Sequence, residues 1–185
     1  MIGDWGDAAY AASQIFITIT HILLMCSYFI TGRRLQLATS ITANSMGSLS
    51  YALLGGWVGV AMCLTGIARD AVSYVIYWRR APSDAGKISG GDWWFLALWV
   101  SLTIGTGLAT MSGLLSLTSM LAALVYTISI WHKNPAVYRL LGILAAALWM
   151  GYNLHVGSIM GAVFELGIMT SSAVGLILYL RRAGR

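Results

Sequence analysis

The feature that most constrains this chain is a succession of long, uninterrupted apolar runs separated by short polar breaks. A helix needs about 20 apolar residues to cross the ~30 Å hydrocarbon core of a bilayer. The apolar residues are continuous and do not alternate with polar ones, which favours helices over barrel strands. We therefore expect an all-α integral membrane protein with about seven transmembrane helices. Their predicted ranges are 8–30, 36–54, 57–78, 93–110, 114–131, 137–155 and 158–180.

Charged residues are too scarce for a water-soluble fold. Lys, Arg, Asp and Glu make up 9% of the 185 residues, hydrophobic residues make up 58%, and the mean hydropathy is +0.77. A soluble domain carries about 25% charged residues because water must wet its surface. Asp4 and Asp7 stand where a secretory signal peptide would carry basic residues, so we expect the first apolar run to be retained as a helix. The lipid bilayer is the expected partner of most of the surface.

The basic residues predict how the chain is oriented in the membrane. Every Lys and Arg except Arg69 falls on one side of the predicted bundle, and Asp4 and Asp7 fall on the other. These cations are Arg33, Arg34, Arg79, Arg80, Lys87, Lys133, Arg139, Arg181, Arg182 and Arg185. Cytoplasmic loops carry an excess of Lys and Arg, so we expect the N-terminus outside and the C-terminus in the cytoplasm. The same rule accounts for the net charge of +5 without a nucleic-acid partner.

The second half of the sequence resembles the first when it is shifted by 102 residues, without a gap. Eight of the 26 positions in 55–80 are identical to those 102 residues later, including two glycines, a tyrosine and a pair of arginines. We therefore expect two triple-helix bundles, residues 1–80 and 114–185, joined by a loop and linker helix at 81–113. Because three helices end on the opposite side from where they began, one further crossing lets the second triplet enter in the same orientation. Parallel repeats of this kind occur in transporters.

The 3+1+3 plan with an outside N-terminus resembles the SWEET/PQ-loop superfamily. Residues 153–165, which read NLHVGSIMGAVFE, resemble more specifically the YgjV family of bacterial inner membrane proteins, in which an Asn, a Gly-Ser pair, a second Gly and a Glu have matching spacing. The resemblance implies a bacterial inner membrane location. One departure is that SWEETs are thought to rock about prolines within their helices, whereas Pro82 and Pro135 both fall in predicted loops here. A hinge in this chain would depend on glycine instead.

Four polar residues lie deep in the predicted hydrocarbon region. Counted at about 1.5 Å per residue from the cytoplasmic arginines, His21, Asn44, Arg69 and Asp70 all fall at ~14–17 Å, near the midplane. Ionisable groups in hydrocarbon are costly and usually face the bundle interior. Adjacent helix residues do not face each other, so we expect Arg69 and Asp70 to pair with other helices, His21 and Asn44 being the nearest candidates. A solute or proton site and a structural polar clamp both remain open.

A second polar layer is expected nearer the outer interface. By the same count its members lie at ~21–27 Å from the arginines. They are Gln14, Tyr51, Asn153, His155 and Glu165. Glu165 continues a line of small residues, Gly157 and Gly161, at the four-residue spacing that lets helices approach closely. For the glycines we favour packing, and for Glu165 packing and a protonation or cation site are both open.

These residues favour a carrier over an enzyme. We expect a small-solute transporter or facilitator in which His21, Asn44, Arg69 and Asp70 hold or gate the solute, with Glu165, His155 and Asn153 at an outer gate or proton-coupling site. The alternative is a membrane receptor or interaction protein without flux. No HExxH, GxSxG or paired-carboxylate pattern points to an enzyme. Cys26 and Cys63 lack metal-ligand spacing, so neither a metal nor another cofactor is expected, while assembly into a homo-oligomer is open.

Overall fold

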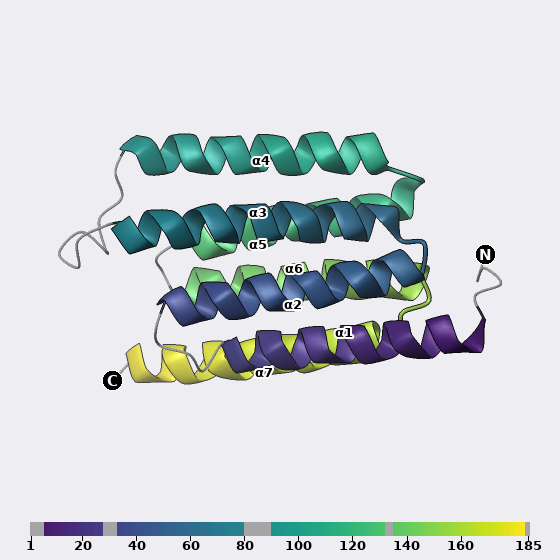
Figure 1. Cartoon of the computed structure of the whole chain (residues 1–185). Helices are drawn as coiled ribbons and strands as arrows, with labels where there is room; N and C mark the ends of the chain where they lie inside the picture. Colours follow the sequence, from purple (N-terminus) through teal and green to yellow (C-terminus); the bar gives the residue numbers. More distant parts are fainter. Residues whose placement is uncertain (1–5, 28–32, 80–89, 132–134, 184–185) are drawn as a thin grey trace.

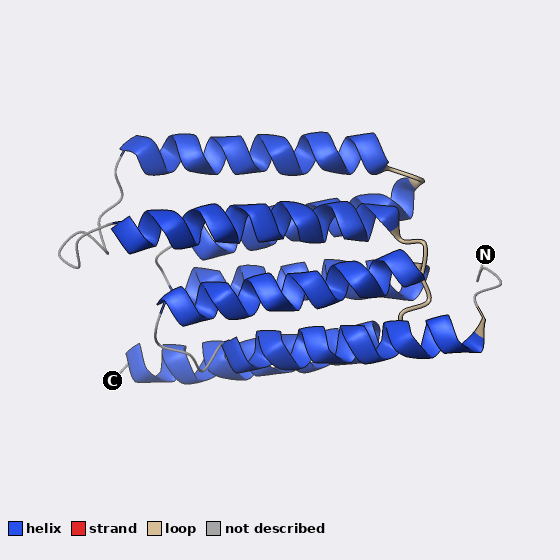
Figure 2. Cartoon of the chain, in the orientation of Figure 1, coloured by secondary structure: helices blue, strands red, loops and turns tan. Residues whose placement is uncertain are grey.

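The computed structural model describes residues 6–27, 33–79, 90–131 and 135–183. These residues form seven α-helices and one short 3-10 turn, with no strand among them (Figures 1 and 2). The elements are α1 (Asp7–Ser27), α2 (Arg33–Leu53), α3 (Trp57–Arg79), α4 (Gly90–Thr110), η2 (Leu114–Ser116), α5 (Leu117–Trp131), α6 (Pro135–His155) and α7 (Ile159–Ala183). The predicted all-α class is confirmed, and the predicted helices lie within a few residues of the observed ones.

Four of these helices are long and apolar enough to cross a membrane. The segments are Asp7–Ser27, Trp57–Ile76, Trp93–Thr110 and Ile159–Arg181, in α1, α3, α4 and α7. A shorter apolar stretch, Leu114–Ser129, covers η2 and most of α5. The prediction of about seven apolar spans is therefore supported at four helices. In α2 the reason is composition, because hydroxyl and amide side chains are frequent along it.

The polar side chains of α2 are largely satisfied by their own helix. The hydroxyls of Thr39, Thr42 and Ser45 each donate to the carbonyl four residues earlier, at 2.8–3.0 Å. Back-bonding of this kind lowers the cost of a hydroxyl inside an apolar environment because no lone donor remains. A helix of low hydropathy can therefore lie within the same bundle as its more apolar neighbours.

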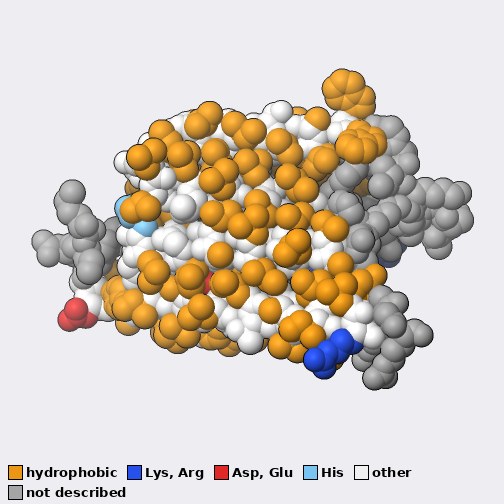
Figure 3. Space-filling view, turned by 180° about the vertical axis from the view of Figure 1, so that it is seen from behind, with side chains coloured by type: hydrophobic (Ala, Val, Ile, Leu, Met, Phe, Trp, Pro, Cys, Tyr) orange, Lys and Arg blue, Asp and Glu red, His pale blue; other side chains and the backbone are white. Residues whose placement is uncertain are grey.

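The outside of the molecule is apolar and much of the inside is polar. Hydrophobic side chains are spread along the helices over the face in Figure 3, where few charged side chains are visible. On α4, Trp94 is 79% exposed, and Val163, Leu166 and Ile177 of α7 are at least half exposed. Monomeric soluble proteins rarely expose apolar patches larger than a few hundred Å². A surface of this kind belongs in lipid, where such side chains have no cost.

The helices pack in two layers that meet at their edges. Within one layer α2 lies between α1 and α3, and within the other α6 lies between α5 and α7. The layers touch through α1 against α7 and through α3 against α5, while α4 packs on α3 and α5 at one edge (Figure 1). Successive helices run in opposite directions, so α1, α3, α5 and α7 point the same way.

The turns that join α2 to α3 and α6 to α7 have the same geometry. Gly55 and Gly157 adopt φ values of 70° and 77°, which glycine reaches without strain. The next residue in each turn donates its backbone N–H to a carbonyl five residues earlier, Gly56 to Tyr51 and Ser158 to Asn153, both at 2.8 Å. This is the Schellman ending of a helix. Gly157 thus serves the turn, and the prediction that it begins a helix-packing line is wrong.

Gly161, the other glycine predicted to pack, does lie at a close contact, and so does Gly59. A Cβ on Gly59 would come within 2.7 Å of the Tyr152 ring and 2.8 Å of Tyr51. A Cβ on Gly161 would come within 2.7 Å of the Asn153 side chain. Both sites are far tighter than any ordinary Cβ contact, so only glycine fits without displacing these side chains.

Charged residues mark the two ends of the bundle. Arg34 near the start of α2, Arg139 near the start of α6 and Arg181 near the end of α7 lie at one end. Asp7 begins α1 at the other end. Figure 3 accordingly shows blue and red side chains at opposite ends. Several residues used for the predicted orientation lie outside the described residues: Asp4, Arg80, Lys87, Lys133 and Arg185.

Candidate functional site

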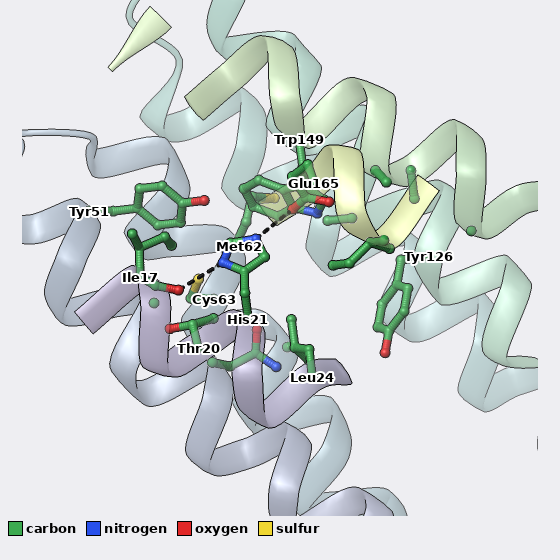
Figure 4. Close-up of a pocket in the computed structure, with 18 of the residues that line it drawn as sticks. Ile17, Thr20, His21, Leu24, Tyr51, Met62, Cys63, Tyr126, Trp149 and Glu165 are labelled. Atoms are coloured by element: carbon green, nitrogen blue, oxygen red, sulfur yellow. Dashed lines mark hydrogen bonds and ion pairs between the residues drawn. The ribbon is translucent and has the colours of Figure 1, made fainter. Parts of the chain in front are cut away.

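A cavity of about 100 Å³ lies in the middle of the bundle, between the two layers. Helices α1, α2, α3, α5, α6 and α7 all contribute to its wall. One water needs about 10–15 Å³ of such space, so the cavity can hold several waters or one small solute. Its polar and aromatic lining residues are Thr20, His21, Asn44, Tyr51, Cys63, Arg69, Tyr126, Trp149 and Glu165 (Figure 4).

The structure brings together most, but not all, of the predicted site residues. His21, Asn44 and Arg69, expected at one level, do line one cavity, and two residues expected in a higher layer, Tyr51 and Glu165, line it as well. The remaining predicted residues, Asp70, Asn153 and His155, do not line this cavity. The midplane cluster of the first three helices is therefore only half of the lining, and the second layer of helices supplies the rest.

His21 and Glu165 form a buried pair that joins α1 to α7. The Nε2 atom of His21 lies 3.1 Å from Oε1 of Glu165, and the two residues are only 2% and 6% exposed. The other ring nitrogen, Nδ1, lies 2.8 Å from the Ile17 carbonyl, and the ring stacks on Phe164 with centroids 5.5 Å apart. Figure 4 shows the imidazole between Ile17 and Glu165.

The predicted separation of His21 and Glu165 into two depth layers is wrong. The depth estimate from the sequence holds only if the arginines at the ends of different helices lie at one level. At the end of the bundle that holds the cations, α7 continues beyond the end of α1 (Figure 1). Glu165 therefore lies deeper than its distance along the chain from Arg181 indicates, at the level of His21.

Arg69 and Asp70 pair with each other, contrary to the prediction. The Arg69 Nε donates to Asp70 Oδ1 at 2.9 Å. The two Cβ atoms point in different directions, but the long Arg side chain has enough rotatable bonds to turn back to its neighbour. Neither His21 nor Asn44 is a hydrogen-bond partner of this pair. Asn44 instead donates its amide to the Ser40 carbonyl of its own helix at 2.9 Å.

The Arg69–Asp70 pair is the centre of a clamp across three helices. Ser40 of α2 donates to Asp70 Oδ2 at 2.6 Å, and Arg69 Nη1 donates to Thr127 of α5 at 2.8 Å. The guanidinium also lies over the Tyr126 ring, 5.5 Å from its centroid. The Arg69 charge is thus matched by a carboxylate, and the clamp ties α3 to a helix of each layer. The structural polar clamp, one of the two alternatives that the sequence did not decide between, is therefore present in the structure.

Tyr51 and Asn153, expected in one layer, are bonded to each other. The Tyr51 hydroxyl donates to Asn153 Oδ1 at 2.9 Å, and Asn153 is fully buried. The backbone N–H of Gly59 donates to the Tyr152 hydroxyl at 2.7 Å. The rings of Tyr51, Trp149 and Tyr152 pack together with centroids 5.4–5.9 Å apart. We call these three rings the aromatic cluster.

A wider hollow of about 730 Å³ lies at the Asp7 end of the bundle. Asp7, the α2–α3 and α6–α7 turns, Tyr152 and the exposed His155 line it. Tyr152 borders this hollow and Tyr51 borders the central cavity, so the aromatic cluster separates the two. His155 therefore lies at the mouth of this hollow and not beside Glu165. The prediction that the two residues belong to one outer group is wrong.

Three residues of the clamp and the aromatic cluster were not predicted from the sequence. Ser40 and Thr127 are ordinary hydroxyl residues in apolar helices, and Tyr152 resembles any interfacial tyrosine. Their importance comes only from the helices that they face. Among the described residues no group of three or more His, Cys, Asp or Glu side chains could hold a metal ion, and Cys26 and Cys63 are free thiols.

Comparison with known proteins identifies the family. One protein-family model, Imp-YgjV, described as a bacterial inner membrane protein, matches residues 11–183. No curated protein and no solved structure matches the chain. The match covers all of the helices described above except the first few residues of α1.

The clamp makes a prediction about stability. Replacing Asp70 by Asn leaves the Arg69 guanidinium buried without its anion, which costs about 3–5 kcal/mol, whereas replacing both members of a buried pair costs far less. We expect Asp70→Asn to lower the thermal unfolding midpoint of the purified protein strongly, and Arg69→Gln with Asp70→Asn to recover most of the loss. Asp7→Asn, at an exposed carboxylate, serves as the control. Equal loss in the single and double variants would contradict the clamp.

Proposed function

The chain belongs to the Imp-YgjV family of bacterial inner membrane proteins, and we propose that it carries a small solute across that membrane through its central cavity. The observation that supports this function is the polar cavity at the junction of the two helix layers, inside a bundle whose outside is apolar. Ionisable side chains within the membrane are expensive and usually mark a solute or ion pathway. A cavity with charges drawn from both layers is a suitable place for such a pathway.

The lining favours a small uncharged polar solute. Arg69 is matched by Asp70, and His21 by Glu165, so the wall offers no excess charge to an ion. The Asn44 side chain and the hydroxyl of Tyr51 offer hydrogen bonds, and Trp149 offers an aromatic face. A volume of about 100 Å³ limits the solute to a few heavy atoms in this closed state. Larger solutes would require the layers to move apart.

We propose that the two layers are a duplicated unit, with residues 1–80 and 114–185 related by an axis along the membrane normal and 81–113 as the linker. Several lining residues support this because they are 102 positions apart. These pairs are His21 with Ala123, Leu24 with Tyr126, Asn44 with Ala146, Gly47 with Trp149, Cys63 with Glu165, and Gly66 with Ile168. Tyr51 and Asn153 have the same separation and touch each other. A SWEET-like 3+1+3 plan would place the pathway at this axis.

The aromatic cluster is the proposed gate on the Asp7 side. It lies between the hollow and the cavity, and the Tyr51–Asn153 hydrogen bond crosses from one layer to the other. Opening this side would break that bond and separate Tyr152 from Gly59. Glycines at 55 and 157, in the turns beside the cluster, would absorb the change in backbone angle.

We propose that the Asp7 end faces outward, with all seven helices crossing the membrane and the C-terminus in the cytoplasm. The cations at the other end of the bundle support this orientation. A fusion of alkaline phosphatase to the C-terminus should be inactive, because that enzyme folds only outside the cytoplasm, and a fusion of green fluorescent protein there should fluoresce. Active phosphatase at the C-terminus would reverse the proposed orientation.

A receptor or interaction protein without flux is the second candidate. The observation that favours it is the full pairing of Arg69, which leaves its charge engaged with Asp70 and Thr127 and gives it a structural role. In that case the cavity would bind a solute and hold it. The two candidates differ in whether a solute that enters from one side emerges on the other.

Flux through proteoliposomes tests the transport proposal. We expect glycerol or urea, as uncharged probes, to cross faster than in protein-free vesicles, with acetate excluded. Ala146→Leu fills the cavity and should reduce that flux by on the order of tenfold, since each ~1.4 kcal/mol added to the barrier is tenfold in rate. Ala147→Leu is the matched control on the same helix, because Ala147 does not line the cavity.

The outcomes separate the candidates. Flux that is unchanged by Ala146→Leu would remove the cavity from the pathway. Vesicles with wild-type protein that pass no probe faster than empty vesicles would contradict transport of small uncharged solutes, and saturable binding of a probe in that case would favour the receptor. Unfolding midpoints of both Leu variants check that each one folds.

A further inference from the structure

The hydrogen-bond contacts of His21 and Glu165 show how many hydrogens this pair holds. A backbone carbonyl only accepts hydrogen bonds, so the 2.8 Å contact to Ile17 places a hydrogen on Nδ1 of His21. The 3.1 Å contact between Nε2 and Glu165 Oε1 then needs one further hydrogen, carried by either atom. With it, the pair is neutral overall, as imidazolium with carboxylate or as imidazole with carboxylic acid. Without it, two lone pairs face each other and the pair has a net charge of −1.

No other described carboxylate borders the cavity to replace this proton acceptor. The titratable or charged groups that face the cavity from the other helices are Tyr51 of α2, Cys63 and Arg69 of α3, and Tyr126 of α5. Asp70 points into the clamp, where Arg69 and Ser40 bond it. Trp149 of α6 has no titratable group. A proton taken up by the cavity would therefore be bound by His21 and Glu165.

The pair also lies on a seam between the two layers. His21 belongs to α1 and Glu165 to α7, and the contact between these two helices is one of those that hold the layers together. The ring is fixed from its own helix by Ile17 and from α7 by stacking on Phe164. Loss of the shared proton would turn an attractive contact at this seam into a repulsive one. A buried anion would also draw water into the cavity.

We propose that His21 and Glu165 together bind one exchangeable proton, and that release of this proton loosens the α1–α7 seam and opens the cavity. The proton enters the pair from water on one side of the membrane and leaves to water on the other. Only N–H or O–H bonds change, and no other reactant is needed. The coupling role rests on the proposed transport function, whereas proton binding by the pair stands without it. The ion that drives the carrier would accordingly be the proton.

Nitrogen NMR of the His21 ring in lipid nanodiscs tests this site directly. The chain has three histidines, so replacing His132 and His155 by Gln leaves His21 as the sole signal. His155 is exposed at the mouth of the hollow, outside the cavity. With ¹⁵N-histidine labelling, we expect Nδ1 to stay protonated and the Nε2 signal to change in one transition as the pH is raised, because the hydrogen between Nε2 and Glu165 leaves the pair. Glu165→Gln in the same background should abolish that transition.

An Nε2 signal that is invariant over the whole pH range in which the chain stays folded would overturn the proposal, and so would a transition that persists in Glu165→Gln. The first of these results needs only the folded parent chain, so a variant that fails to fold does not leave the question open. The result is also independent of flux. If His21 titrates with Glu165 but no probe crosses, transport fails and the proton site stands. If a probe crosses and Nε2 is invariant, transport stands and the proton site fails.

If the probe crosses and the Nε2 signal of His21 shows the expected transition, the solute flux in proteoliposomes should change over the same pH interval as that signal. Glu165→Gln should remove that pH dependence, and Ala147→Leu, which alters neither the pair nor the cavity, should keep it. A pH dependence equal in wild type and Glu165→Gln would show that another group controls opening.

Discussion

A polar side chain within a bilayer must find its partner inside the protein, because lipid offers neither a hydrogen bond nor a counter-charge. This constraint accounts for most of the bundle. The apolar residues of α4 and α7 face outward, while buried hydroxyls donate to their own helices. Among the described residues, the buried acidic and basic side chains meet in two pairs, Arg69 with Asp70 and His21 with Glu165. Both lie beside the cavity.

These two charge pairs have different consequences. The Arg69–Asp70 pair is formed by neighbours on α3, and its hydrogen bonds to Ser40 and Thr127 hold three helices together. The His21–Glu165 pair joins one helix of each layer and depends on a proton. The first is therefore suited to stabilise the bundle in every state. The second is suited to differ between states, since its strength depends on proton occupancy.

The sequence predicted the helices well and the side-chain pairings poorly. The apolar runs located the helices to within a few residues, because a bilayer fixes the length of a helix that crosses it. Five of the eight site residues predicted from their depth line the cavity. Their hydrogen-bond partners were not predicted, because pairing depends on how far each helix is displaced along its axis, as with Glu165, or on how a flexible side chain such as Arg69 turns back. Tyr152 carried no signal in the sequence, because only its position against Gly59 makes it part of the aromatic cluster.

We propose that the space between the layers is a wet site on a solute pathway, and the accessibility of the Cys63 thiol to water tests this proposal. This thiol lines the cavity, and Cys26 is exposed elsewhere, so the Cys26→Ser chain presents one cavity thiol. Methanethiosulfonates react with the thiolate, which needs water around it. A small water-soluble methanethiosulfonate should therefore modify Cys63 in the folded protein in lipid vesicles. A Cys63 that stays unmodified in the folded chain, yet reacts fully once the chain is unfolded, would show that the cavity is dry and that no pathway passes through it.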